Sequence, residues 1–183
     1  MGLNLAKMEI KYFRSFRNVE FNIGRKITAI SGQNGVGKSN ITSLIASGSG
    51  LNKKGKMGSN FQPEFYDFFN IDLEEQFTEY KLFLTYSEKD KAGSVLKRLS
   101  FKDDTAANRG VRIIPRTSNR DLPNVGSKDA EKMAKDTFGV GGAARVPIPT
   151  IYLSISRLYP LGERKETVTV KKIKKTNKLY QNE

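Results

Sequence analysis

The sequence predicts an α/β fold in which a strand runs through a glycine-rich loop into a helix, with an antiparallel sheet later in the chain. Residues 26–30 are apolar and β-branched, so they are expected to form the strand. Between 37 and 47 the apolar residues Ile41, Leu44 and Ile45 mark one face of a helix. The glycines lie between these two elements, where a tight backbone bend is needed.

Alternating apolar residues predict the other strands. Residues 5–12 and 17–23 are expected to form two strands on either side of a turn near Arg14, Ser15 and Phe16. An antiparallel sheet is expected at about 78–116, where turn residues separate several short strands. Its clearest strand has apolar residues at every second position: Tyr80, Leu82, Leu84 and Tyr86.

Two elements are predicted in the second half of the chain. Residues 127–138 are expected to form a short helix, with Ser127 as its N-cap and Gly139 as its terminator. Residues 148–155 form the most apolar run there and are expected to be a strand. Glycine, serine, asparagine and lysine dominate residues 48–60, which predicts a mobile loop.

The glycine-rich stretch matches the pattern GxxxxGK[ST] at every fixed position. Such a loop curls so that successive backbone N–H groups face an anion, and the following helix adds the positive end of its dipole. Lys38 would supply a cation to the β- and γ-phosphates, and the Ser39 hydroxyl would ligate Mg²⁺. The predicted nucleotide-binding residues here are Gly32, Gln33, Asn34, Gly35, Val36, Gly37, Lys38, Ser39 and Asn40.

This motif, in its strand–loop–helix context, predicts a P-loop NTPase fold that binds a nucleoside triphosphate, with ATP and Mg²⁺ as ligands. The alternative is a glycine-rich loop that merely caps a helix. A guanine-reading Asn-Lys-x-Asp segment is absent from the sequence, which argues against a small GTPase.

Composition excludes several kinds of chemistry. The 183 residues contain neither cysteine nor histidine, so disulfides, thiolate metal sites and Ser/His or Cys/His hydrolases are excluded. No apolar run approaches the roughly 20 residues of a membrane span, so no membrane partner and a cytoplasmic location are expected. The net charge of +13 favours a polyanionic partner, and DNA is one candidate.

Residues 11–21 and 27–40, together with the motif, resemble the opening of the SMC/RecF/OLD group of ABC-type ATPases, where an F-R-S segment precedes a G-x-N-G-x-G-K-S/T loop. Residues 149–160 resemble a strand and turn of OLD-like ATPases of DNA repair and phage defence. The resemblance implies an ABC-type N-terminal lobe with a mixed or antiparallel sheet wrapped around the P-loop helix. It also implies that Arg14 and Ser15 lie near the nucleotide phosphates; alternatively, Arg14 is a solvated turn residue.

Other implied roles are less direct. Gln33 and Asn34 would approach a dimer partner, and Arg157 would be either a charge sensor or a strand-end residue in a salt bridge. A Walker B segment, a catalytic glutamate and a serine-glycine signature are not evident. Residues 68–72 come nearest to Walker B, but Asn70 interrupts them.

Residues 1–165 are therefore expected to be an N-terminal lobe, and the basic residues 166–183 the start of an insertion or a truncation point. A C-terminal lobe, or a second copy in an ATP-dependent dimer, would complete the ATPase, and this chain alone would be almost inactive. Two alternatives stay open: a non-enzymatic nucleic-acid-binding module that uses the basic strands and tail, and a small P-loop kinase.

Overall fold

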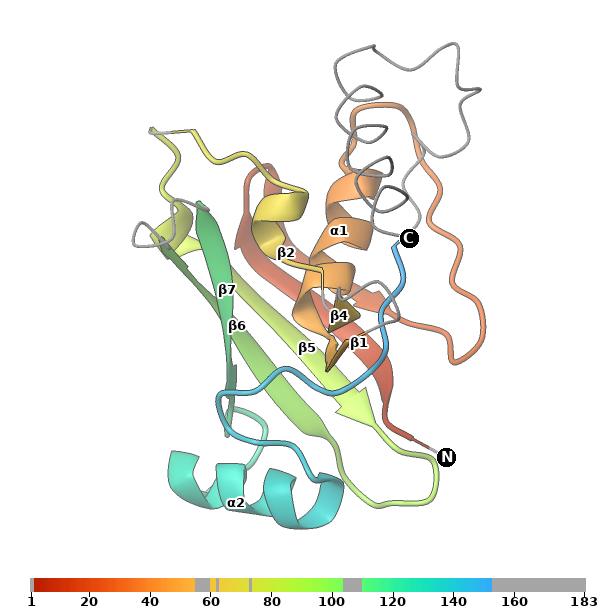
Figure 1. Cartoon of the computed structure of the whole chain (residues 1–183), viewed down its shortest axis with the longest axis vertical. Helices are drawn as coiled ribbons and strands as arrows, with labels where there is room; N and C mark the ends of the chain where they lie inside the picture. The colour runs from red at the N-terminus through yellow and green to blue at the C-terminus, as the bar shows by residue number, and fades with distance from the viewer. Residues whose placement is uncertain (1, 55–59, 62, 73, 104–109, 153–183) are drawn as a thin grey trace, which may run out of the picture. The chain divides into compact units, whose positions relative to one another are not determined.

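A computed structural model of the chain describes residues 2–54, 60–61, 63–72, 74–103 and 110–152 (Figure 1). Residues 1–151 form one compact unit, which holds every element described below. Arg157 and the basic tail fall outside the described residues, so their predicted roles are not addressed by the structure.

A five-stranded antiparallel sheet is the centre of this unit. Its strand order is β2-β1-β5-β6-β7. Because β1 and β2 pair through a turn and β5, β6 and β7 form a meander, the predicted N-terminal hairpin and the predicted sheet at about 78–116 are both confirmed. The strands are β1 (Asn4–Phe13), β2 (Phe16–Asn22), β5 (Lys81–Ser87), β6 (Val95–Asp103) and β7 (Val111–Thr117).

Two α-helices flank the sheet. Helix α1 (Lys38–Gly48) lies across one face of the sheet, and α2 (Ser127–Phe138) lies beyond one end of the strands (Figure 1). Gly139, with φ 69°, ends α2 as predicted, but the N-cap is Gly126, and Ser127 is the first helical residue. Within the described part of the chain, no helix is long and apolar enough to cross a membrane.

Shorter elements connect these parts. They are the strands β3 (Leu51–Lys54) and β4 (Asn60–Phe61) and the 3₁₀ turns η1 (Phe65–Asp67) and η2 (Phe77–Glu79). Strands β3 and β4 pair with each other, so the ends of the predicted 48–60 loop form a small ladder.

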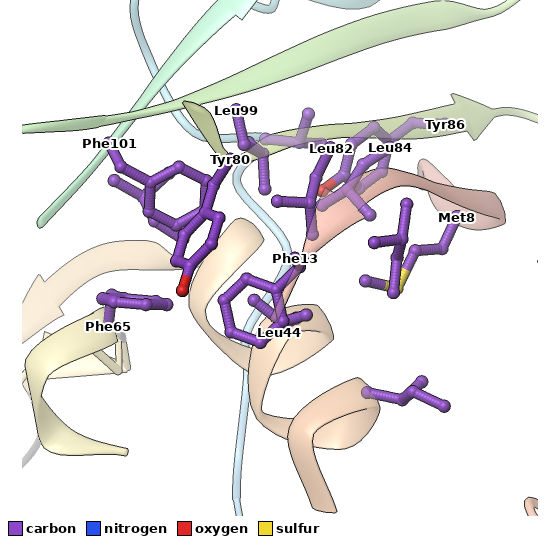
Figure 2. Close-up of a cluster of buried hydrophobic side chains, with 14 of the residues drawn as sticks. Met8, Phe13, Leu44, Phe65, Tyr80, Leu82, Leu84, Tyr86, Leu99 and Phe101 are labelled. Atoms are coloured by element: carbon purple, nitrogen blue, oxygen red, sulfur yellow. The ribbon is translucent and has the colours of Figure 1, made fainter. Parts of the chain in front are cut away.

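The core lies between α1 and one face of the sheet, which we call the inner face. Leu44 of α1 is fully buried there, and Gly48 lies so close to Leu84 of β5 that any side chain would collide with it. An aromatic cluster continues this core toward the start of β5, where the Phe13 and Tyr80 rings lie 4.7 Å apart (Figure 2). Burial of these large apolar side chains fixes α1, and with it the glycine-rich loop, against the sheet.

Two predicted strands need correction. Residues 26–30 do not form a strand, so no strand leads into the loop, and Ile27 is 86% exposed. The five-stranded sheet is antiparallel, which is one of the two arrangements that the resemblance implied. Residues 148–152 form no strand, and the rest of the predicted 148–155 strand lies outside the described residues. A strand needs a neighbour for its backbone hydrogen bonds, and residues 26–30 have none within the described ranges.

Candidate functional site

The glycine-rich loop connects residues 27–31, which form no regular secondary structure, to the first turn of α1. Gly35 and Gly37 have φ values of 84° and 93°, in the left-handed region that glycine adopts without strain. The side chains at 33–36 are exposed, and Val36 is 49% exposed despite being apolar. The loop tip therefore projects from the molecule, and the glycines make its bend feasible.

Lys38, the first residue of α1, folds back over the loop. Its Nζ donates hydrogen bonds to the carbonyl oxygens of Gly32, at 2.8 Å, and Gln33, at 2.6 Å. The ammonium therefore lies across the mouth of the loop rather than in bulk solvent. Carbonyl and phosphate oxygens both accept hydrogen bonds from an ammonium group. At this position Lys38 can therefore exchange its two carbonyl acceptors for phosphate oxygens when a nucleotide binds.

The N-terminus of α1 has donors that no side chain caps. Gly37 is the N-cap residue, and the first turn holds no acidic residue. The Ser39 hydroxyl is exposed and makes no hydrogen bond to any other described residue. Free N–H groups, a positive helix end and an available hydroxyl are the features that an anion and its metal ion require. Asn40, half-buried in the same turn, was also predicted to bind nucleotide.

The turn between β1 and β2 packs against this loop. Phe16 lies so close to Gly37 that a Cβ added there would be 2.6 Å from the Phe16 Cζ atom. Arg14 and Ser15 form the turn itself, and Arg14 has a left-handed φ of 48°. The structure thus brings the predicted residues Arg14 and Ser15 to within two residues of a direct contact with the loop.

Arg14 is not a fully solvated turn residue. Its Nε donates to Glu75 Oε1 at 2.8 Å, and its Nη2 donates to the Asn70 carbonyl at 2.9 Å. The side chain is 33% exposed. Burial tends to raise the pKa of Glu75, but the hydrogen bonds from Arg14 and Tyr80 outweigh burial and lower it. Glu75 is therefore ionised at neutral pH and forms a lasting ion pair with Arg14.

Two neighbours of the predicted site, Arg17 and Glu75, were not among the residues predicted to form it. Arg17 donates to the carbonyl oxygens of Arg14 and Phe16 and lies 3.9 Å from the Tyr12 ring centroid. Glu75 is 61 residues from Arg14 in the chain. Phe16 and Arg17 belong to the F-R-S-F-R run on which the resemblance rests, so this run was the one sequence signal for them. Nothing in the sequence distinguishes Glu75 from the nearby acidic residues.

A comparison with protein families identifies the domain to which this loop belongs. A family model described as an AAA domain matches residues 7–183, which include the turn, the loop and α1. The chain belongs to the AAA domain family. Membership of this family shows a nucleotide-binding ATPase domain with an α/β fold. No significant match was found among curated proteins or among solved structures.

The match to the AAA domain model includes residues 32–40. Among the described residues, no three carboxylates gather into a cluster that could hold a metal ion. Residues 68–72, the nearest sequence match to Walker B, form no strand, and Asn70 offers its carbonyl to Arg14 instead.

Proposed function

We propose that this chain binds the triphosphate of ATP through residues 32–40, with the Ser39 hydroxyl as a protein ligand to Mg²⁺. One observation carries the proposal: Lys38 lies across the mouth of a glycine-rich loop whose helix begins with uncapped donors. In that arrangement the amides surround the β-phosphate, and Lys38 neutralises charge on the β- and γ-phosphates.

The finer proposal is that the chain is the N-terminal lobe of an SMC/RecF/OLD-type ATPase in DNA repair or phage defence. The packing of Phe16 against Gly37 supports it, because this contact joins the F-R-S turn to the P-loop as that resemblance implies. A C-terminal lobe or a second copy would then supply the Walker B acid, the catalytic glutamate and the signature.

Titration with a fluorescent ATP analogue, with and without Mg²⁺, tests the nucleotide proposal. Lys38→Ala removes a charge-assisted contact and should weaken binding at least about tenfold. Ser39→Ala should reduce the gain in affinity that Mg²⁺ gives. Lys132→Ala, an exposed change on α2, is the matched control and should bind like the wild type. Equal affinities in the wild type and Lys38→Ala would refute the proposal.

A second candidate function rests on the opposite face of the sheet, the outer face. In the β-register Arg98 is directly opposite Arg116, and Lys102 is opposite Arg112. Together with Lys81, these residues are exposed and form what we call the basic face. Within the described residues, no carboxylate pairs with Arg98, Lys102 or Arg116. Within each pair the Cβ atoms are about 5 Å apart, and the two pairs are four residues, or about 13 Å, apart along the strands, so positive charge extends along this face.

Glu9 does not neutralise Arg98 or Arg116 of this patch. Glu9 lies on the same face, two strands away from Arg98, but it is already bound by Arg120, Lys7 and Lys11. Arg98 and Arg116 lie opposite each other with no carboxylate partner among the described residues, and cations placed in this way release counterions when they contact a nucleic acid. The proposed second function is therefore sequence-independent binding of duplex DNA through the phosphate backbone.

Fluorescence anisotropy with a duplex DNA at several salt concentrations tests the second function. The double variant Arg98→Gln/Arg116→Gln should weaken binding and reduce the slope of log K against log [salt] by about 1 for each phosphate that the protein no longer neutralises. Lys132→Ala should change neither quantity. An unchanged salt slope in the double variant would exclude the basic face as the binding surface.

A further inference from the structure

The guanidinium of Arg14 is held along one edge. Glu75 accepts hydrogen bonds from Nε at 2.8 Å and from Nη2 at 3.3 Å, and the Asn70 carbonyl accepts a second bond from Nη2. The Arg14 Cζ atom also lies 5.7 Å from the Phe13 ring centroid and 5.4 Å from that of Phe69. No hydrogen bond from Nη1 is found within the described parts of the chain. The bonds to Nε and Nη2 thus fix the orientation of the planar guanidinium, while Nη1 keeps its donors for another acceptor.

Glu75 is itself held in place. The Tyr80 hydroxyl donates a hydrogen bond to Oε1, and the backbone N–H of Asp72 donates to Oε2 at 3.3 Å. Only 19% of the Glu75 side chain is exposed, so little water competes for the carboxylate. The anion that faces Arg14 is therefore rigid, unlike a surface carboxylate that meets a cation only part of the time.

The turn that carries Arg14 packs against the nucleotide loop. Arg14 is in the β1–β2 turn, and two residues later Phe16 touches Gly37, the residue before Lys38. A cation fixed at this place would lose less side-chain freedom on meeting a phosphate than a freely rotating arginine would.

We propose that Glu75 is a positioning residue for nucleotide binding: together with the Asn70 carbonyl it holds Arg14 by Nε and Nη2, so that Nη1 is presented to a phosphate oxygen. The inference rests on the proposed ATP site. The opposite arrangement, in which Glu75 competes with phosphate for Arg14, would require the bonds from Arg14 to be broken at each binding event. The support that Tyr80 and Asp72 give to Glu75 favours positioning.

A double-mutant cycle with the fluorescent ATP analogue tests this role. Glu75→Gln should weaken binding about 2- to 12-fold, the effect of freeing one ordered side chain. Arg14→Ala should weaken it about tenfold or more, as expected for removal of a charged hydrogen bond. In the Arg14→Ala background, Glu75→Gln should have no further effect, and Glu75→Asp should keep part of the affinity. Glu88→Gln, which removes the ion pair with Lys91, is the matched control and should bind like the wild type.

Urea unfolding of the same variants separates positioning from a purely structural role. Glu75→Gln lowers the stability in either case, but only positioning makes its effect on affinity vanish when Arg14 is absent. Tighter binding by Glu75→Gln, unchanged binding, or an equal loss of affinity in both backgrounds would overturn the inference. If the wild type failed to bind, or Lys38→Ala bound equally well, the ATP site itself would be refuted instead.

Discussion

The ring of Phe16 lies against the backbone of Gly37, so that a Cβ at Gly37 would be 2.6 Å from Cζ and 2.9 Å from Cε2. This contact joins the first hairpin of the sheet to the start of α1. Because Gly37 also has a φ of 93°, both the space and the backbone angle at this position demand glycine.

We therefore expect Gly37→Ala to lower the free energy of unfolding by about 1–3 kcal/mol and to weaken binding of the ATP analogue. Gly35→Ala is the matched control: its φ is 84°, but nothing lies within 4 Å of an added Cβ, so it carries the backbone strain without the collision. In urea unfolding, the free energy of unfolding of Gly37→Ala should be lower than that of Gly35→Ala. Equal stabilities would show that the Phe16 contact does not constrain the loop.

The pairing of Glu9 with Arg120 predicts a stability change at low pH. Both Glu9 oxygens accept hydrogen bonds from Arg120, at 2.8 and 2.9 Å, and mainly these bonds lower the Glu9 pKa to about 2 from 4.5. Since the carboxyl pKa is lower in the folded state, its stabilisation is complete above about pH 4.5 and is lost as the pH falls toward 2.

Glu9→Gln should accordingly lower the free energy of unfolding by about 1–3 kcal/mol at pH 7, and by much less near pH 2. Glu20→Gln is the control, because Glu20 pairs with Lys7 but its side chain is 53% exposed. That change should cost less than about 1 kcal/mol. Urea titrations at several pH values measure the free energy of unfolding of both variants. A constant penalty for Glu9→Gln between pH 2 and 7 would contradict the ion-pair account.

Local patterns were sufficient to predict much of the fold. The alternation at Leu82, Leu84 and Tyr86 reports a strand with one face in the core, and this face is buried in the structure. The glycine, lysine and serine spacing predicted the start of α1 to within one residue. These features depend on neighbours a few positions away, which the sequence displays directly.

Features that depend on distant partners were not predictable. Glu75 meets Arg14 across 61 residues, and Arg120 meets Glu9 across 111, so nothing local distinguishes them from other charged residues. The error at residues 26–30 has a similar origin. Their apolar, β-branched composition indicates a strand, but a strand forms only where another strand offers its backbone groups.

Lys97 provides a third test, at the opposite end of the pH scale. It is fully buried on the inner face, where Nζ donates to Thr117 Oγ1 at 2.8 Å and to the carbonyls of Gly141 and Gly142. Burial lowers its pKa from 10.5 to about 8. The folded protein thus holds fewer protons than the unfolded chain between these two values, and Lys97 makes stability rise with pH there.

Replacing this lysine should remove that rise. Lys97→Met should flatten the pH dependence of unfolding between pH 8 and 10.5, where the wild type gains up to about 1.4 kcal/mol per pH unit from this group. It should also destabilise the protein at pH 7, because Thr117 Oγ1 and the Gly141 and Gly142 carbonyls would each lose the hydrogen bond from Nζ. The two carbonyls would keep the backbone N–H groups of Ala144 and Thr117 as donors. Lys102→Met, at an exposed position on β6, should leave the pH dependence unchanged. If the free energy of unfolding rose equally with pH in Lys97→Met and in the wild type, groups other than Lys97 would be the cause of the rise.

The segment before the loop, residues 27–31, gives the last prediction. Ile27 is 86% exposed in a stretch that pairs with no strand among the described residues, whereas Ile41 of α1 is 5% exposed. A hollow of about 400 Å³ lies beside it, lined by β2, α1 and residues 28–31. Our proposal that a second lobe or copy completes the fold gives this segment a role, because an added strand would satisfy its backbone groups and cover Ile27.

For the isolated chain this proposal requires that Ile27→Asp leave the free energy of unfolding within about 0.5 kcal/mol of the wild type. Ile41→Asp should instead cost several kcal/mol, since it places a carboxylate in the core. Amide hydrogen exchange at residues 27–31 should be fast in the same samples, because unpaired N–H groups exchange without any unfolding. If Ile27→Asp destabilised the chain as strongly as Ile41→Asp, or if these amides were protected, the segment would already be packed and would have no place for a partner strand.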